Sequence, residues 1–381
     1  MNILVVVFHF PPISGGGVIV AVELVNNFAK LGHSVTVVTP NIEWNGPIYD
    51  PKLHANVDVV KVDVPSKNQI KVAARRCKNY LKNASVKLGQ EKKYDFIFSI
   101  FHPFHMAPHA AIQAGKELQI PTIVKIDDAV YQKTTGLKSI QRKIEKSYNS
   151  KALKQSSLVL VPNSETKTVV ENFYGVNSAN ISLVPNGVDL NKFIKSNPKS
   201  RRIIFSGVMY HHRGLDKLLN ILPNVLKKIP DIEVLLYGNG PELDKLKSIV
   251  NENHLESTVK FMGWIPNEQI PSILSNASLG IGPLRSTDVT KGALPIKILE
   301  YMASSLPIIA IKDTLPSDVL YDGENGFLVE NEKELEEKIV TIFSNENMRM
   351  NMGIKSRQIV AEFDWEILVN KIISQFEGLR D

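Results

Sequence analysis

The chain of 381 residues repeats one pattern twice: a short, continuous apolar run followed by a longer stretch with helical periodicity. These runs are rich in β-branched residues, which is typical of strands buried on both faces of a parallel sheet. In the first half they lie at 3–8, 35–39, 58–62, near 97–101, 122–126 and 158–162. The alternation predicts an α/β fold with doubly wound, Rossmann-like sheets.

The pattern breaks near residue 190 and then starts again. The segment NGVDLNKFIKSNPKSRR is polar and rich in turn formers, and it is followed by RIIFSG, EVLLYGNG, VKFMG, LGIGP, LPIIAI and GFLV. The chain is also longer than one hydrophobic core usually supports. We therefore predict two Rossmann-like domains, 1–190 and 191–362. A C-terminal helix in 363–381 is expected to cross back to the first domain.

Several protein classes are disfavoured by composition. The chain has one cysteine, Cys77, so an intrachain disulfide is impossible and a reducing, cytoplasmic compartment is expected. No apolar run reaches the ~20 residues that a membrane-spanning helix needs. The N-terminal apolar run lacks a preceding basic region, so we interpret it as a first strand rather than a signal peptide.

The net charge of +6 is concentrated in two basic runs. Residues 67–93 hold nine Lys and Arg against one acidic residue, Glu91, and residues 133–154 hold seven against Glu145. Apolar residues are mixed into the first run. The runs therefore predict either contact with an anionic membrane surface or solvated helix faces. Nucleic acid is not an expected partner, because no reader motif accompanies the charge.

Gly15, Gly16 and Gly17 follow the first apolar run and precede the first helical stretch. Backbone amides at such a turn can bind phosphate, and a tight turn without a ligand is the alternative. A dinucleotide site is disfavoured for two reasons. Val20 stands where a third glycine is expected, and the second strand ends at Thr39 rather than at an acidic residue for the ribose.

The stretch FHPFHMAPHA holds His102, His105 and His109. Pro103 and Pro108 interrupt any helix that would place the three rings on one face, so a metal site is not expected. A pocket loop at the carboxyl end of a strand is the favoured interpretation, with His102 facing the ligand. Loop histidines without a role are the alternative for the other two.

Asp127 and Asp128 end another apolar run. A carboxylate at that edge can hold or deprotonate an acceptor hydroxyl, and it can equally cap the next helix. The chain contains no Asp-x-Asp sequence. That absence disfavours an enzyme in which paired carboxylates hold a metal on a diphosphate.

Two segments of the second half carry candidate phosphate ligands. SGVMYHHRG places Arg213 just before a helical stretch, where a guanidinium suits a diphosphate, and a surface arginine is the alternative. KGALPIKILEYMASSLPIIA places Lys297 three residues before Glu300, in a helix that begins near Pro295. A structural helix needs neither charge, so this segment also predicts a ligand site, and a simple pairing of Lys297 with Glu300 is the alternative.

Taken together, these motifs resemble the GT-B nucleotide-sugar glycosyltransferases, specifically the large retaining family 4. The resemblance covers nearly the whole chain: FPPISGG and LVNNFAKLGHSVTVVT near the N-terminus, LVPNGVDLNKF between the domains, then GNGPELDKLK, FMGWIP, ALPIKILEYMASSLPIIA and DGENGFLV. It implies the GT-B fold, with two Rossmann-like domains that face each other across a cleft. It also implies transfer of a hexose-type sugar from a UDP or GDP donor, with retention and without a metal or cofactor.

The resemblance assigns roles to individual residues. Glu300 is expected to bind the ribose hydroxyls, and turn amides with Arg213, Lys291 or Lys297 to bind the diphosphate. Asp127, Asp128, His102 and Arg213 are the expected catalytic residues. The expected donor-binding residues are Gly15, Gly16, Gly17, Gly207, Arg213, Gly238, Gly240, Gly263, Trp264, Ile265, Lys291, Gly292, Ala293, Leu294, Lys297 and Glu300.

This chain departs from the family pattern at three positions. Gly292 replaces the earlier of two glutamates, Val208 replaces an arginine, and Asp127 replaces a histidine. A sub-branch with a Pro-x-Lys-x-x-Glu core tolerates such changes. The expected acceptor is a glycan or lipid-linked glycan of bacterial surface polysaccharide, lipopolysaccharide or capsule synthesis, at the inner face of the membrane. A nucleotide-sugar epimerase and a catalytically degenerate partner subunit are the alternatives.

Overall fold

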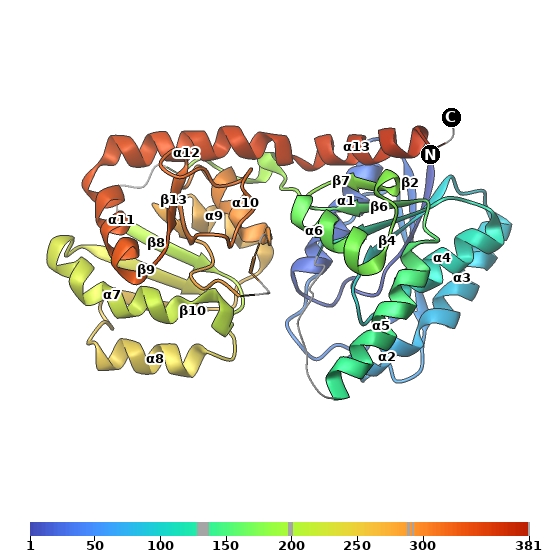
Figure 1. Ribbon diagram of the computed structural model, residues 1–381, viewed down its shortest axis with the longest axis horizontal. Helices are drawn as coiled ribbons and strands as arrows, with labels where there is room; N and C mark the ends of the chain where they lie inside the picture. Colours follow the sequence, from blue (N-terminus) through green and yellow to red (C-terminus); the bar gives the residue numbers. More distant parts are fainter. Residues whose placement is uncertain (128–136, 197–200, 288–289, 292, 380–381) are drawn as a thin grey trace. The chain divides into compact units, whose positions relative to one another are not determined.

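The computed structural model describes residues 1–127, 137–196, 201–287, 290–291 and 293–379. It comprises two compact units, Met1–Asn186 with Trp365–Asp381, and Gly187–Asp364 (Figure 1). The chain leaves the first unit once and returns to it with its last helix. The boundaries expected from the sequence, 190 and 362, fall within a few residues of these two transitions.

The first unit contains a seven-stranded sheet with the order β3-β2-β1-β4-β5-β6-β7. All its strand pairings are parallel. The strands are β1 (Asn2–Val6), β2 (Ser34–Asn41), β3 (Val57–Asp63), β4 (Phe96–Phe101), β5 (Thr122–Ile126), β6 (Leu158–Val161) and β7 (Ile181–Leu183). The short edge strand β7 was not expected from the sequence, because three residues give little periodic signal.

Helices connect these strands. They are α1 (Gly16–Lys30), α2 (Ile70–Arg76), α3 (Lys78–Glu91), α4 (Ala107–Leu118), α5 (Leu137–Leu153) and α6 (Ser164–Val169). The final helix, α13 (Trp365–Glu377), packs against α1, as the expected crossing back requires. Phe28 of α1 and Phe376 of α13 both contact the ring of Phe96 in β4, at centroid distances of 6.3 and 4.6 Å.

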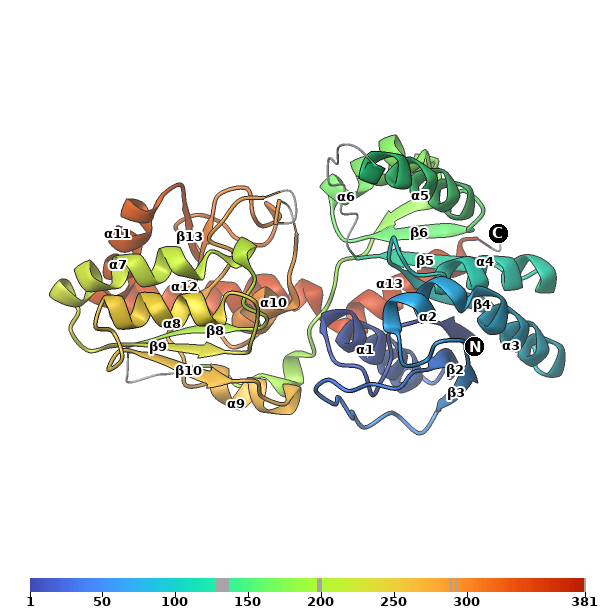
Figure 2. The same cartoon turned by 90° about the horizontal axis from the view of Figure 1, so that it is seen from below.

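The second unit contains a six-stranded parallel sheet with the order β10-β9-β8-β11-β12-β13. Its strands are β8 (Arg201–Ser206), β9 (Ile232–Tyr237), β10 (Val259–Gly263), β11 (Leu279–Ile281), β12 (Ile308–Ile311) and β13 (Gly326–Val329). The helices are α7 (Leu215–Lys228), α8 (Leu243–Glu252), α9 (Ile270–Leu274), α10 (Ile296–Ala303), α11 (Glu332–Ser344) and α12 (Glu346–Val360). Figures 1 and 2 show α7 and α8 side by side on this sheet.

Both faces of this second sheet are covered. Ile203 and Phe205 of β8 point into one apolar cluster, whereas Ile204 between them points into another. β12 alternates in the same way, with Ile309 in the first cluster and Ile308 in the second. Successive strand side chains point to opposite faces, so only continuous apolar runs can bury both. This explains the unbroken β-branched runs of the sequence.

Arg357 of α12 holds the segment that enters the second unit. Its guanidinium donates hydrogen bonds to the carbonyl oxygens of Leu190 at 3.1 Å and Phe193 at 2.8 Å, and to that of Ala303 in α10. Burial lowers the pKa of Arg357 from its ordinary value. A single side chain therefore satisfies three backbone acceptors of the entering segment and of α10.

Among the described residues, no helix has the length and apolar character needed to cross a bilayer.

Replacement of Arg357 by Met is expected to lower the free energy of unfolding by about 2–4 kcal/mol, because three carbonyl groups lose a charged donor. Lys355→Met on the same helix is the matched control, since its ion pair with Glu324 is exposed and worth at most about 1 kcal/mol. Chemical denaturation monitored by circular dichroism measures both changes. Equal losses in the two variants would contradict this role for Arg357.

Candidate functional site

The loops after β8, β9 and β10 meet at the carboxyl edge of the second sheet. The amide of Gly207 donates to the carbonyl of Tyr237 at 3.0 Å, and that of Met209 donates to Asn239 at 2.9 Å. The amide of Gly238 donates to the carbonyl of Gly263 at 2.7 Å. Three of the predicted donor-binding glycines thus lie in adjoining loops at one edge. In open α/β sheets, this edge is where ligands bind.

Glycine is required at two of these positions. Gly238 has a φ of +117°, and a Cβ atom on it would lie 2.1 Å from the carbonyl oxygen of Gly207. Gly207 has a φ of +126°, and a Cβ there would lie 3.2 Å from Nζ of Lys297. Gly207 therefore presents exposed backbone rather than a side chain beside the Lys297 ammonium.

Lys297 is 8% exposed, and its Nζ lies 3.6 Å from the centroid of the Phe205 ring. Within the described ranges, this buried ammonium has no hydrogen-bond partner. Its pKa lies well below the ordinary lysine value because of burial and the nearby charge of Arg213, which outweigh the opposing effect of Glu300. The fold thus brings together Lys297, Arg213 and Glu300, as predicted from the sequence, around a cation suited to an anionic ligand.

Tyr301 positions the end of β8 beneath this site. The Ser206 amide donates to the Tyr301 hydroxyl at 2.9 Å, and both side chains are buried. Burial raises the pKa of Tyr301, so the phenol stays protonated. Sequence reasoning did not single out Tyr301, because a tyrosine in an apolar helical stretch gives no signal of the strand that it contacts.

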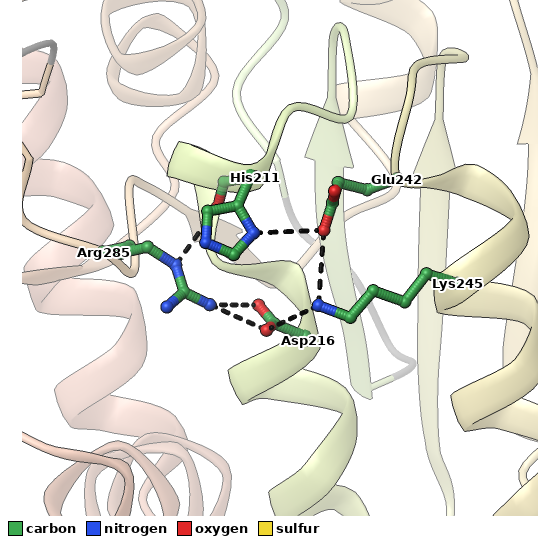
Figure 3. Close-up of polar contacts among 5 residues, drawn as sticks. All are labelled: His211, Asp216, Glu242, Lys245 and Arg285. Atoms are coloured by element: carbon green, nitrogen blue, oxygen red, sulfur yellow. Dashed lines mark hydrogen bonds and ion pairs between the residues drawn. The ribbon is translucent and has the colours of Figure 1, made fainter.

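A polar network holds the loop that carries Arg213 (Figure 3). Arg285 donates two hydrogen bonds to Asp216 of α7, at 2.9 and 2.7 Å, and a third to the carbonyl of His211 at 3.2 Å. His211 contacts Glu242 at 3.2 Å, and Lys245 lies 3.4 Å from both Glu242 and Asp216. The network therefore joins the loop after β8 to the N-terminal region of α8 and to the loop after β11.

The charges in this network are matched. Burial acts to raise the pKa of Asp216, but hydrogen bonds and charge from Arg285, with Lys245, hold that pKa below its ordinary value. Asp216 therefore remains ionised at neutral pH. Arg285 and Asp216 were not selected from the sequence, since 69 positions separate them and neither belongs to a local motif.

The loop after β11 continues into a turn that holds Lys291. The Thr290 hydroxyl is buried, accepts from the Thr287 amide at 2.8 Å and donates to the Arg285 carbonyl at 2.8 Å. The amides of Lys291 and Ala293 donate to Thr287 and Thr290, at 3.0 and 3.2 Å. Lys291 is exposed. Gly292, which was also predicted to bind the donor, lies outside the described residues.

The other predicted donor ligands occupy separate positions. Gly240 packs on the backbone of Met209 within the joined loops, and Trp264 is 45% exposed just after β10. Ile265 and Leu294 instead pack against the apolar cluster beneath the sheet, so their backbones rather than their side chains are available. Gly15, Gly16 and Gly17 lie in the first unit at the start of α1, where all three are exposed.

In the first unit, the histidines divide into two environments. The ring of His105 stacks on His102 at 4.1 Å and meets His9 edge-on at 4.4 Å. Burial, with smaller effects from neighbouring histidines, lowers the pKa of His9 to about 4 and that of His105 to about 2. These two rings are therefore neutral at physiological pH, when imidazole can both donate and accept a hydrogen bond. His9 was missed because it follows the first strand alone.

His109 lies apart and is buried. It contacts the Asn149 side chain at 2.9 Å and stacks on Tyr148 at 4.2 Å, which is a structural environment. Across the described part of the chain, no group of His, Cys, Asp and Glu has the arrangement of a metal site.

Asp127 accepts a hydrogen bond of 2.6 Å from Nζ of Lys125, whose side chain is completely buried in β5. The predicted catalytic carboxylate therefore already neutralises a buried cation. Lys125 itself was overlooked, although a lone charge inside an apolar run is a readable signal. Asp128 lies outside the described residues.

Removal of the Asp127 carboxylate by Asp127→Ala is expected to destabilise the protein by about 3–5 kcal/mol, because Lys125 becomes an uncompensated buried charge. Combining it with Lys125→Met should restore most of that loss. Urea denaturation of both single variants and of the double variant measures this coupling. If Asp127→Ala unfolds at the same urea concentration as the unsubstituted protein, the carboxylate does not compensate Lys125.

Two family models match the chain: Glycosyltransferase Family 4 at residues 14–192 and Glycosyl transferases group 1 at residues 189–359. Among curated proteins, an uncharacterized glycosyltransferase of Methanocaldococcus jannaschii is 28% identical over 180 residues, 47% of this chain and 48% of that protein. The poly(ribitol-phosphate) alpha-N-acetylglucosaminyltransferase of Staphylococcus aureus is 23% identical over 62% of this chain and 47% of its own. The matched part of this chain thus spans about half the length of these relatives.

Solved structures show the same fold over nearly the full chain. Anabaena HepE in complex with UDP has a TM-score of 0.75 at 17% identity and covers 99% of this chain and 100% of its own. Sucrose-phosphate synthase of Thermosynechococcus elongatus has a TM-score of 0.77 at 17% identity, covering 99% and 98%. The architecture is therefore GT-B. With one model on each half, the chain belongs to the glycosyltransferases of family 4 and group 1.

Proposed function

We propose that this protein transfers a hexose-type sugar from a nucleoside diphosphate donor, of the UDP or GDP type, to an acceptor hydroxyl. The buried Lys297 ammonium carries the proposal. Burying a cation without a hydrogen-bond partner is unfavourable, and a fold keeps such a group where a ligand supplies the missing anion. The exposed backbone of Gly207 lies beside Nζ, and Arg213 is a second cation within electrostatic reach.

Several residues then have distinct roles in donor binding. Lys297 and Arg213 would stabilise the negative charge that develops on the leaving diphosphate, the main requirement when a glycosyl phosphate bond breaks. Glu300, on the same helix one turn after Lys297, would accept hydrogen bonds from the ribose hydroxyls. Lys291, which is exposed on the turn after β11, would supply a further cation to the diphosphate.

UDP is the first nucleotide to test. HepE was crystallised with UDP and with UDP-glucose, and the pneumococcal transferase GtfA was crystallised with UDP and GlcNAc. These ligands belong to those proteins and enter here as a guide to the donor class. Retention without a metal ion follows the family pattern. In that mechanism the leaving diphosphate receives the acceptor proton, and two protein cations replace a metal as the counter-charge.

The acceptor is proposed to be a glycan or lipid-linked glycan in bacterial surface polysaccharide synthesis, at the inner face of the cell membrane. Among the curated relatives are the Staphylococcus aureus enzyme named above and a phosphatidyl-myo-inositol mannosyltransferase of Mycobacterium tuberculosis, 24% identical over 51% of this chain. In the first unit, the neutral rings of His9 and His105 offer donors and acceptors suited to sugar hydroxyls.

Isothermal titration calorimetry with UDP, GDP, ADP, CMP and dTDP, each without and with Mg²⁺, tests the donor site. We expect one nucleoside diphosphate to bind selectively, and Lys297→Met to weaken it about 10- to 100-fold through loss of a charge-assisted hydrogen bond. Lys247→Met, on the exposed side of α8, is the control and should bind normally. Folded protein that binds none of the five would refute the proposed donor site.

The free Lys297→Met variant should be at least as stable as the unsubstituted protein, because it replaces a buried amine that has unfavourable surroundings by an apolar side chain that still packs against Phe205. Differential scanning calorimetry checks this expectation. A large drop in Tm would mean that Lys297 stabilises the fold. Weaker nucleotide binding by this variant would then reflect the damaged fold rather than a lost contact with the ligand.

Donor binding should also take up a proton. The pKa of Lys297 is depressed in the free protein and should rise when a diphosphate supplies negative charge. Affinity is therefore expected to fall as the pH rises above 8, where the terminal phosphate is already fully ionised because its pKa is about 6. Calorimetry in buffers of different ionisation enthalpy counts the protons. Lys297→Met should abolish the uptake, and uptake that persists in this variant would assign it to another group.

A further inference from the structure

Helix α5 presents an apolar stripe on its outer face. Ile140, Ile144 and Tyr148 recur at intervals of four residues and are 58%, 66% and 40% exposed. On the opposite face, Asn149 and Leu153 are buried against the rest of the unit. Figure 2 shows α5, in green at the top of the view, as an outer helix of its unit. Single exposed isoleucines are ordinary, but two on adjacent turns with an aromatic ring after them form a contiguous surface.

Cations lie beside this stripe. The Nζ atom of Lys78 donates to the Tyr148 hydroxyl at 3.2 Å. Lys143 and Lys151 are exposed on the same helix, at helical positions next to the isoleucines. Lys146 points elsewhere, with its Nζ atom 4.4 Å from the centroid of the Phe173 ring.

We define the α5 face by its apolar members Ile140, Ile144 and Tyr148 and by the cations Lys78, Lys143 and Lys151. Within α5, from residue 140 onward, Glu145 is the one acidic residue.

We propose that the α5 face docks on an anionic lipid surface. The combination of exposed apolar and cationic side chains favours a lipid surface over a nucleic acid. Transfer of the aliphatic side chains from water to the boundary between headgroups and acyl chains contributes favourable binding free energy. Attraction between the neighbouring cations and the phosphate headgroups adds to it. Lys and Arg can bury their methylene stems beside the isoleucines while their charged ends stay with the headgroups. A nucleic acid would use the cations but would leave the exposed isoleucines in water.

This inference rests on the proposed function only for the nature of the acceptor. A transferase that acts on lipid-linked glycans meets its substrate in the plane of a membrane. Docking through the first unit would leave the nucleotide chemistry of the second unit unchanged. The two proposals can therefore fail separately, because vesicle binding is measured without nucleotide and nucleotide binding is measured without vesicles.

Sedimentation with phosphatidylcholine vesicles, with and without phosphatidylglycerol, tests the docking. We expect binding to the phosphatidylglycerol vesicles alone, weakened at least about tenfold by the double change Ile140→Asn and Ile144→Asn. Ile354→Asn with Ile367→Asn is the matched control, because these isoleucines are 52% and 48% exposed on α12 and α13. The control should bind as the unsubstituted protein does. Circular dichroism confirms that each variant is folded.

A second pair of variants tests the cations. Lys143→Glu with Lys151→Glu should abolish binding, whereas Lys247→Glu with Lys371→Glu, on α8 and α13, should weaken it far less. If charge reversal abolishes binding while the isoleucine changes leave it intact, the protein is attracted by charge without inserting, and the proposal is wrong.

Sedimentation equilibrium tests whether a second copy of this protein, rather than a lipid surface, covers the α5 face. A self-associating protein that the Ile140→Asn and Ile144→Asn variant turns into a monomer would show that a second copy covers the α5 face. That result, or equal binding to both kinds of vesicle, would also overturn the proposal.

Discussion

The close approach of two glycine loops is the constraint on which the candidate donor site depends. Gly238 can lie against the Gly207 carbonyl because neither residue has a side chain, and their positive φ angles turn both loops across the edge of the sheet. Parallel pairing of β8 with β9 brings these loops together, since parallel strands end at the same edge. The exposed Gly207 backbone beside Nζ of Lys297 is a consequence of this packing.

The donor site also illustrates how a fold tolerates an unfavourable charge. Lys297 lies between an aromatic ring and Arg213, in surroundings that favour its neutral form. Nearby, the same edge carries a fully matched network in which Arg285 and Lys245 neutralise Asp216 and Glu242. The contrast is informative: matched charges fix the loops, and the cation without a hydrogen-bond partner is the group that an anion would stabilise.

In the first unit, contacts between distant segments changed the interpretation of Asp127 and separated the histidines from one another. Asp127 looked like a carboxylate available to an acceptor hydroxyl, yet it accepts a hydrogen bond from the buried Lys125. Among the histidines of FHPFHMAPHA, the sequence singled out His102 and left His105 and His109 open. In the structure His109 is a packed core residue, whereas His105 stacks on His102 and meets His9 from another strand. Residue type and local spacing do not report these contacts, because they form between segments distant in sequence.

The sequence by itself determined the fold class, the two doubly wound units and the return of the last helix. Continuous β-branched runs can only be satisfied in sheets covered on both faces, and that requirement is local and periodic. The sequence also predicted Arg213, Lys297 and Glu300 as donor ligands, because charged residues beside glycine turns and helix starts are not needed for folding alone. The tertiary structure alone decided that Lys297 lies near Gly207 with no hydrogen-bond partner among the described residues, that Arg285 holds Asp216, and that Ile140 and Ile144 lie exposed beside cations. These facts depend on burial and on contacts across many residues, which no linear pattern encodes.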